Sequence, residues 1–219
     1  MKKLLINENI IRFVKEFISF YEFKIVTIND INNNDDIYII SFMFENADKI
    51  INKCNKIYII NLEQLSVKLN EKKIVYDYEK RILNYFNNIK QYIYNPKIEI
   101  IDYSIENKIL WKNLYNINIK KIMDGKYNNI KINKHDKNIN IISLVNLKNR
   151  NEFKNKYLNN LNIYNFNDHW EEKRREIFER AKILINIHAS TTYKICELFR
   201  INEALENKII VISQHCYKN

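Results

Sequence analysis

Glycine and proline are almost absent from this chain of 219 residues, which contains one of each, Gly125 and Pro96. A P-loop or a GxGxxG dinucleotide fingerprint needs several glycines, because the backbone must come close to a phosphate group. Collagen and flexible glycine-serine linkers are themselves built from glycine. The composition therefore excludes all of these, and any nucleotide site must rely on other groups.

Cysteine is also scarce. Cys54, Cys196 and Cys216 are an odd number of residues, they show no CxxC or other metal-ligand spacing, and the chain has no HExxH motif. A disulfide framework or a zinc site normally needs such spacings. We therefore expect no bound metal, no disulfide framework and a reducing, cytoplasmic compartment.

Long apolar runs are missing as well. Residues 4–6 are apolar, but Asn7, Glu8 and Asn9 interrupt them before the hydrophobic region of a signal peptide is complete. No stretch approaches the roughly 20 apolar residues that span a bilayer. We expect a soluble protein without a transmembrane segment.

Isoleucine, asparagine and lysine are abundant, as in proteins from A+T-rich genomes, and the net charge is +10. A basic chain favours anionic partners such as nucleic acid or phosphorylated small molecules. The densest basic cluster, residues 173–175, is flanked by Glu171, Glu172 and Glu176. Acidic neighbours and dispersed charge favour a solvated, lysine-rich surface over a nucleic-acid interface.

Short β-rich apolar runs alternate along the chain with amphipathic helical stretches. Several runs consist almost entirely of Ile, Val, Leu and Tyr, which is typical of parallel strands covered on both faces. The alternation predicts βαβ units and an α/β fold with open parallel sheets. The predicted strands are residues 24–28, 37–42, 56–60, 98–102, 139–145, 162–166, 182–188 and 208–213, and the predicted helices are residues 12–21, 78–92, 170–181 and 193–206.

The alternation occurs in two blocks. Apolar periodicity is weakest over residues 116–138, where Gly125 lies among Asn, Lys and Asp residues. A boundary there divides the chain into residues 1–120 and 121–219, and both lengths suit an α/β domain. We therefore expect two domains.

In open α/β sheets, ligands bind outside the carboxyl ends of the strands. The residues directly after the predicted strands are therefore the candidate site residues. In the first domain they are Glu63, Gln64, Asp102, Tyr103 and Ser104, and in the second they include Lys148, Arg150, His188, Ser190, Thr191 and Thr192.

The last predicted βαβ unit is the most informative. A hydroxyl at residues 190–192 can cap the following helix, whose free N–H groups and positive dipole can receive a diphosphate without a glycine loop. On that helix Glu197, Arg200 and Glu203 follow each other at intervals of three residues. The carboxylates suit sugar hydroxyls and the guanidinium suits phosphate, while the same spacing also fits an ion-pair network on a solvated helix face. His188, at a strand end, is either a packed histidine or a catalytic one.

Several segments form a recognisable set. They are Arg174, the run AKILINIH at 181–188, the spacing Glu197-x-x-Arg200-x-x-Glu203-Ala204-Leu205, the run VIS at 211–213, and upstream YIINLEQL at 58–65 and IIDYSIENKILWK at 100–112. Together these segments resemble glycosyltransferases of the GT-B fold, especially a group found in giant viruses and some bacteria. The resemblance extends from about residue 55 to about residue 215 and is most specific toward its end.

The resemblance implies two Rossmann-like domains whose parallel sheets face each other across a cleft. The C-terminal domain would be incomplete, because family members continue with a further helical stretch. It also implies transfer of a sugar from a nucleotide-diphosphate-sugar donor to a glycan, lipid or protein acceptor. The donor is a substrate, so no cofactor is expected, and basic side chains with a helix dipole would replace a metal.

The resemblance also assigns roles to residues. Glu203 would face the donor ribose, with Glu197 and Arg200 nearer the sugar or the diphosphate. His188 would face the cleft, and the catalytic residue is not identified, with His188 and Glu197 as candidates. The further donor-binding candidates are Ser190, Thr191, Thr192, Lys148, Arg150 and Arg174. The acceptor side of the cleft would carry Glu63, Gln64, Asp102, Tyr103 and Ser104.

Two other hypotheses remain open. Arg175, Gln214 and Ile195 stand where the family often has Asp, Glu and Glu, so the chain can also be a nucleotide-sugar-binding relative without catalysis. The basic charge supports a third hypothesis, a nucleic-acid-associated α/β protein, which predicts binding that weakens steeply with salt.

Overall fold

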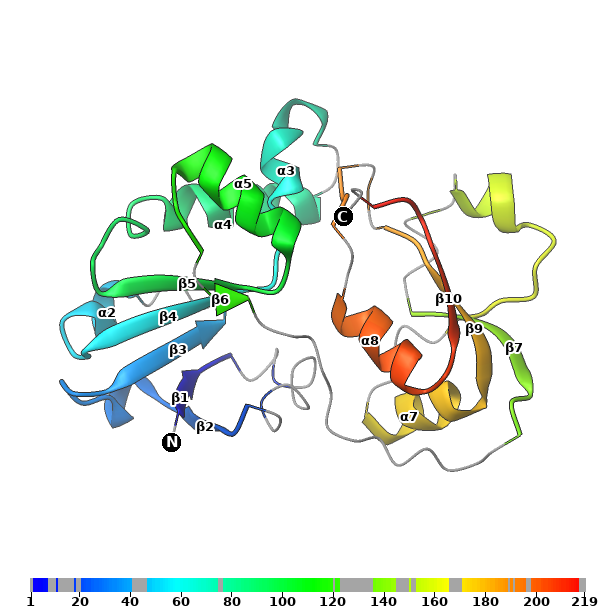
Figure 1. Ribbon diagram of the computed structural model, residues 1–219, viewed down its shortest axis with the longest axis horizontal. Coiled ribbons are helices and arrows are strands. Elements are labelled where there is room, and N and C mark those ends of the chain that lie inside the picture. Colours follow the sequence, from blue (N-terminus) through cyan, green and yellow to red (C-terminus); the bar gives the residue numbers. More distant parts are fainter. Residues whose placement is uncertain are drawn as a thin grey trace. The chain divides into compact units, whose positions relative to one another are not determined.

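The computed structural model describes residues 2–7, 11, 18, 21–40, 47–74, 77–119, 121–122, 136–144, 150, 153–165, 171–188, 190, 192–195 and 198–216. The chain divides into two compact units, Met1–Gly125 and Lys126–Lys218, each built on its own sheet (Figure 1). The division predicted from the sequence, between the domains 1–120 and 121–219, lies a few residues earlier.

The first unit is built on a sheet with the strand order β2-β1-β3-β4-β5-β6, in which every described pairing is parallel. The order reverses between β1 and β3, as in a doubly wound sheet. The strands are β1 (Lys2–Leu5), β2 (Phe23–Val26), β3 (Asp36–Ile40), β4 (Lys56–Asn61), β5 (Ile98–Asp102) and β6 (Lys121–Ile122).

Helices α4 (Asp77–Ile89) and α5 (Ile105–Tyr115) cover one face of this sheet (Figure 1). The rings of Phe86 in α4 and Trp111 in α5 meet with 5.8 Å between their centroids. The sheet face beneath carries the fully buried isoleucines Ile37, Ile39, Ile57 and Ile59. The shorter elements of the unit are α2 (Ala47–Ile51), α3 (Ser66–Leu69) and the 3-10 turns Ile28–Asp30 and Glu71–Lys73.

The second unit has a parallel sheet with the order β10-β9-β7-β8. Its first strand, β7, has β8 on one side and β9 on the other, so the order reverses between β7 and β9. The strands are β7 (Ile139–Ser143), β8 (Tyr164–Asn165), β9 (Ala181–Asn186) and β10 (Ile210–Ser213). The helices are α7 (Glu171–Arg180), α8 (Leu198–Glu206) and a single π-helical turn, Lys154–Leu158.

Both faces of the second sheet carry apolar clusters. On one face Phe178 of α7 and Ala204 of α8 are fully buried in a cluster with Leu184 of β9. On the other face Leu158 of the π-helical turn packs with Ile185 of β9. Neighbouring residues of β9 thus point to opposite faces, as the alternation of a strand requires.

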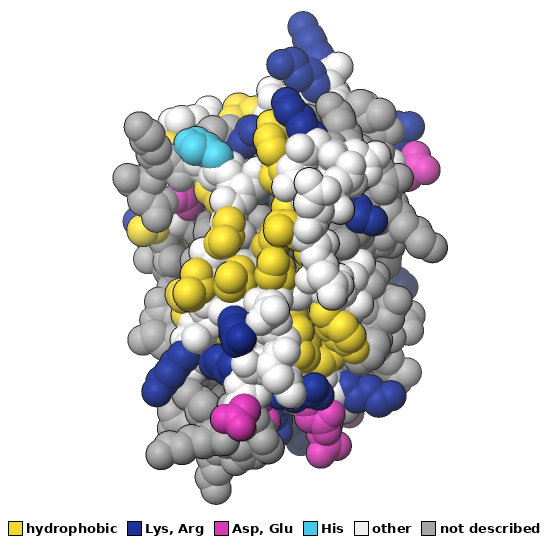
Figure 2. Space-filling model, turned by 90° about the vertical axis from the view of Figure 1, so that its right-hand side faces the viewer, with side chains coloured by type: hydrophobic (Ala, Val, Ile, Leu, Met, Phe, Trp, Pro, Cys, Tyr) yellow, Lys and Arg dark blue, Asp and Glu magenta, His cyan; other side chains and the backbone are white. Residues whose placement is uncertain are grey.

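On the sheet face that carries Ile185, the outer strand β10 is not completely covered by other elements. Ile210 and Ile212, on the same side of the sheet as Ile185, are 64% and 54% exposed. Figure 2 shows hydrophobic side chains gathered in a band when the molecule is viewed from this side.

The prediction of an α/β fold with parallel sheets is confirmed. The strands β1 and β6 and helix α5 were not predicted. The predicted helix 193–206 begins later than expected, because residues 192–195 are not helical and α8 is described from Leu198 onward. The predicted helix 12–21 lies almost entirely outside the described residues. In the part of the chain that the structure describes, no helix is long and apolar enough to cross a membrane.

Candidate functional site

The carboxyl end of β5 in the first unit holds a buried carboxylate. Asp102 is fully buried, and its Oδ2 accepts hydrogen bonds from Asn61 Nδ2 and Trp111 Nε1, both at 2.8 Å. Its Oδ1 accepts from Asn107 Nδ2 at 3.0 Å and from two main-chain N–H groups, those of Tyr103 at 2.8 Å and Ser104 at 3.0 Å. A carboxylate offers about four lone-pair sites. Protein donors therefore fill the capacity of Asp102.

Burial raises the pKa of Asp102, and the hydrogen bonds from Asn61, Asn107 and Trp111 oppose that rise. The two amide side chains also hold the loop that follows β4. Asn61 Nδ2 and Asn107 Nδ2 both donate to the carbonyl oxygen of Glu63, at 2.9 and 2.8 Å, and Asn107 Oδ1 accepts from the N–H of Leu65 at 3.0 Å. The buried carboxylate therefore organises this loop.

All five residues predicted for the acceptor side lie at this one edge of the first sheet. Glu63 and Gln64 occupy the clamped loop after β4, while Asp102, Tyr103 and Ser104 end β5 and lead into α5. Ser104 starts α5, because its Oγ accepts a hydrogen bond from the N–H of Asn107 at 3.2 Å. The structure brings the five together, and it gives Asp102 and Ser104 structural contacts that the sequence analysis did not anticipate.

Tyr85 of α4 belongs to the same region and was not singled out from the sequence. Its hydroxyl is buried with no hydrogen-bond partner among the described residues. Burial, followed by the nearby charges of Glu63 and Asp102, raises its pKa well above 10.0. Helical spacing gave no signal for it, because an aromatic residue beside an apolar stripe is normally part of the core.

In the second unit, Arg150 links the connection after β7 to the end of β9, the two strands between which the order reverses. It lies in the connection between β7 and β8, and its Nε donates to the carbonyl oxygens of Ile187 and His188, both at 3.2 Å, just after β9. A guanidinium is thereby fixed at the carboxyl ends of neighbouring strands. Arg150 and His188 were predicted separately from the sequence, and the structure brings them together.

His188, just after β9, contacts residues that follow β10. Its N–H donates to Gln214 Oε1 at 3.1 Å, and the N–H of Gln214, just after β10, donates to the carbonyl oxygen of Asn186 at 2.9 Å. The His188 side chain is almost completely buried, and its Nε2 lies 3.4 Å from the Sγ of Cys216. Cys216 was not singled out from the sequence, because Cys216 and His188 are 28 residues apart and no motif joins them.

Ser190 and Thr192 form a turn of their own. The N–H and Oγ1 of Thr192 approach Ser190 Oγ at 3.2 and 3.1 Å, and the N–H of Tyr193 donates to the carbonyl oxygen of Ser190 at 3.1 Å. The expectation that Ser190 or Thr192 caps a helix beginning at residue 193 is wrong, because residues 193–195 are not helical and the local hydrogen bonds close a turn instead. The third candidate cap, Thr191, lies outside the described residues. The hydroxyl groups still follow the carboxyl end of β9.

Arg174 and Glu203 were both predicted to bind the donor, and the structure pairs them with each other. Arg174 Nη2 of α7 and Glu203 Oε2 of α8 form an ion pair whose side chains are 17% and 7% exposed. The guanidinium also lies over the ring of Phe178, 5.5 Å from its centroid. Glu203 therefore does not point into bulk water. Glu197, Thr191, Lys148 and the side chain of Arg200 lie outside the described residues.

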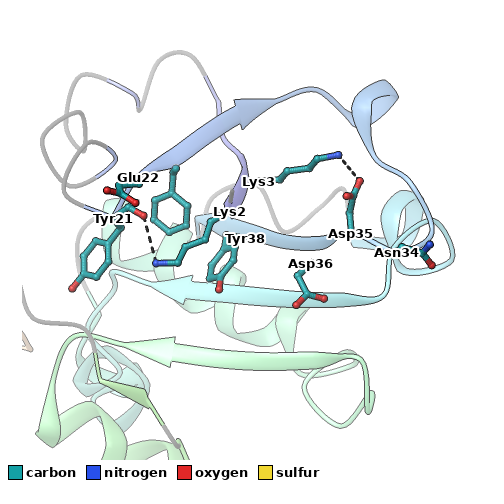
Figure 3. A pocket seen from close by; sticks show the side chains of 9 residues that line it. Lys2, Lys3, Tyr21, Glu22, Asn34, Asp35, Asp36 and Tyr38 are labelled. Atoms are coloured by element: carbon teal, nitrogen blue, oxygen red, sulfur yellow. Dashed lines mark hydrogen bonds and ion pairs between the residues drawn. The ribbon is translucent and has the colours of Figure 1, made fainter.

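A hollow of about 870 Å³ lies elsewhere, at the amino ends of the first three strands of the first unit (Figure 3). Its lining includes Lys2 and Lys3 of β1, Phe23 of β2 and Asp36 of β3. Lys3 already pairs with Asp35 at 2.6 Å. Ligands of parallel α/β sheets bind at the opposite, carboxyl edge, and none of the predicted site residues lines this hollow.

No protein-family model, no curated protein and no solved structure matches this chain. By its fold and site, the chain is an α/β protein with two parallel-sheet units, each with polar residues at the carboxyl edge of its sheet. Among the described residues, no three His, Cys, Asp or Glu side chains lie close enough together to hold a metal ion.

Proposed function

We propose that the protein is a cytoplasmic glycosyltransferase that moves a sugar from a nucleotide-diphosphate-sugar donor to a glycan, lipid or protein acceptor without a metal ion. The second unit binds the donor and the first unit binds the acceptor. Both units are Rossmann-like in this proposal, and their carboxyl edges border a common cleft.

The switch point of the second sheet carries the proposal. Doubly wound sheets bind nucleotides outside the strand ends where the order reverses, here between β7 and β9. Arg150 is fixed there by the carbonyl oxygens of Ile187 and His188. A positioned guanidinium suits a diphosphate, whose negative charge grows as the glycosidic bond breaks.

The other second-unit residues have roles consistent with this position. His188 lies at the same strand ends and is the candidate general base or acid. Arg174 orients the carboxylate of Glu203, which in the proposal accepts hydrogen bonds from ribose hydroxyls. In the first unit, the loop clamped by Asn61 and Asn107 holds Glu63 and Gln64 toward the acceptor.

Thermal unfolding with a panel of nucleoside diphosphates and their sugar conjugates tests donor binding. A ligand present at 100 times its Kd stabilises the folded state by about 2.7 kcal/mol. The Arg150→Gln variant should lose at least about tenfold in affinity, since a charge-assisted pair contributes at least about 1.4 kcal/mol. Arg180→Gln is the matched control, because Arg180 ends α7 and pairs with Asn138, away from the strand ends that carry Arg150.

Product analysis separates the hypotheses. Release or transfer of the sugar from one conjugate supports the transferase. Binding that Arg150→Gln weakens, without turnover of any conjugate, supports a nucleotide-sugar-binding relative and rejects catalysis. If no compound in the panel changes the melting temperature, or if both arginine variants bind equally well, the proposed donor site is wrong.

A further inference from the structure

Cys216 and His188 lie side by side although they come from different strand ends. The sulfur atom and the imidazole Nε2 are 3.4 Å apart, within hydrogen-bonding distance for sulfur. A nucleophile and a base in hydrogen-bond contact are the basic arrangement of an activated thiol, because the base can take the thiol proton and leave the more reactive thiolate.

The partners are held in place by their surroundings. The main chain of His188 is fixed on two sides, by Gln214 Oε1 at its N–H and by Arg150 Nε at its carbonyl oxygen. The sulfur of Cys216 also lies 3.6 Å from the carbonyl oxygen of Gln214. The hydrogen bonds between the segments that follow β9 and β10 therefore hold Cys216 next to His188.

Exposure differs between the two residues of the pair. His188 is 4% exposed, whereas Cys216 is intermediate in exposure, so part of this residue contacts solvent. The charged or titratable groups beside the pair include Arg150, which donates to the carbonyl oxygen of His188, and the exposed His215, which precedes Cys216 in sequence.

Cys54 gives an internal comparison. It is 2% exposed, and burial raises the pKa of its thiol, an effect that Lys97 only partly opposes. A buried thiol of this kind is inert. The two described cysteines therefore differ in access and in partner, and only Cys216 has an imidazole beside it.

We propose that Cys216 is a reactive thiol, activated by His188, that undergoes thiol-disulfide exchange with small-molecule disulfides. His188 Nε2 takes the thiol proton, and the thiolate attacks one sulfur of the disulfide. The new sulfur-sulfur bond forms as the old one breaks, so Cys216 is oxidised and the departing thiolate is reduced and carries away the electron pair. The proton passes from the imidazolium to that thiolate or to solvent.

Modification at this position places a new group at the carboxyl ends of β9 and β10. It therefore changes the access to the edge that also holds Arg150. The reactivity of the thiol is independent of sugar transfer, so the proposal stands or falls separately from the proposed function.

The test uses a chromogenic aromatic disulfide, 5,5′-dithiobis(2-nitrobenzoic acid), at neutral pH on the full chain, with Cys196→Ser as the background to simplify assignment. The reference is the peptide ISQHCYKN, which has the same local sequence, including His215, but lacks His188. We expect Cys216 in the folded chain to react at least about tenfold faster than the peptide. Peptide mass mapping should place the label on Cys216, and Cys216→Ser should abolish the fast phase.

Two histidine variants form a matched pair. His188→Gln should bring the rate down to that of the peptide, whereas His215→Gln should leave it fast. A label found mainly on Cys54, a rate equal to that of the peptide, or an equal loss in both variants would overturn the proposal. If His188→Gln does not fold, the comparison of the folded wild-type chain with the peptide still decides the matter.

Discussion

The two sheets carry polar residues at the same edge and use them in opposite ways. In the first unit, side-chain and main-chain donors converge on the carboxylate of Asp102 and fill it. In the second unit, main-chain atoms around His188 are bonded to Arg150 and Gln214, and the imidazole meets a thiol. A position at a strand end therefore does not by itself distinguish a structural polar group from a reactive one. The hydrogen-bond partners of the group make this distinction.

The largest effect is expected at Asp102. Replacing it in Asp102→Ala leaves the buried donors of Asn61, Asn107 and Trp111 without their acceptor, so the free energy of unfolding should fall by about 4 kcal/mol. Urea denaturation measures this change. A loss below about 1 kcal/mol would show that the carboxylate does not organise the edge.

The Asp102→Asn variant provides the pH control. Because burial raises the folded-state pKa of Asp102 above its ordinary 3.8, the folded state holds the proton more tightly than the unfolded state. The stabilising contribution is full below 3.8 and is lost as the pH rises through the folded-state pKa. The stability difference between wild type and Asp102→Asn should therefore move against the wild type as the pH rises through this window.

A smaller loss is expected from the ion pair between α7 and α8. Arg174→Met leaves the Glu203 carboxylate, which is 7% exposed, without its cation. The free energy of unfolding should fall by about 2 kcal/mol, and the double variant Arg174→Met with Glu203→Met should recover part of that loss. Equal stability of Arg174→Met and wild type would place the pair among surface salt bridges of little energetic value.

The smallest change in the free energy of unfolding is expected at Tyr85, where removal of the buried hydroxyl should not destabilise the protein. The hydroxyl is buried without a partner in the described part of the chain, so Tyr85→Phe should be neutral or more stable by up to about 1 kcal/mol. Trp111→Phe is the matched control, because it removes a donor that Asp102 uses. A clear loss in Tyr85→Phe would mean that the hydroxyl contributes a hydrogen bond after all.

Apolar runs were enough to predict most of the strands. Residues 98–102 were predicted as a strand and form β5 with the same bounds. The predicted helix 78–92 overlaps α4, whose buried side carries Ile82, Phe86 and Ile89. Alternation of strands and helices also led to parallel sheets, because a parallel connection needs a crossover element. The order of the strands could not be obtained in this way.

Helix α5 shows why part of the fold was missed. Its buried face includes Asn107 as well as Leu110 and Trp111, while Ile105 and Ile109 are 63% and 55% exposed. Hydrophobic periodicity fails here, since a polar residue is buried by its bonds to Asp102 and to the loop after β4. Such an inversion depends on partners that are distant in sequence.

The sequence likewise predicted only part of the candidate site. The rule that ligands bind after parallel strands selected Arg150, His188, Asp102 and their neighbours. It did not predict that Arg174 and Glu203 bind each other or that Cys216 meets His188.

The sequence by itself determined the α/β class and the polar residues at strand ends, because both follow from the local order of apolar and polar side chains. Only the tertiary structure decided which of these polar groups are filled by the protein and which come together as reactive neighbours. The physical reason is that a hydrogen bond or an ion pair depends on distances of about 3 Å, and strand order and helix packing set these distances between residues far apart in the chain.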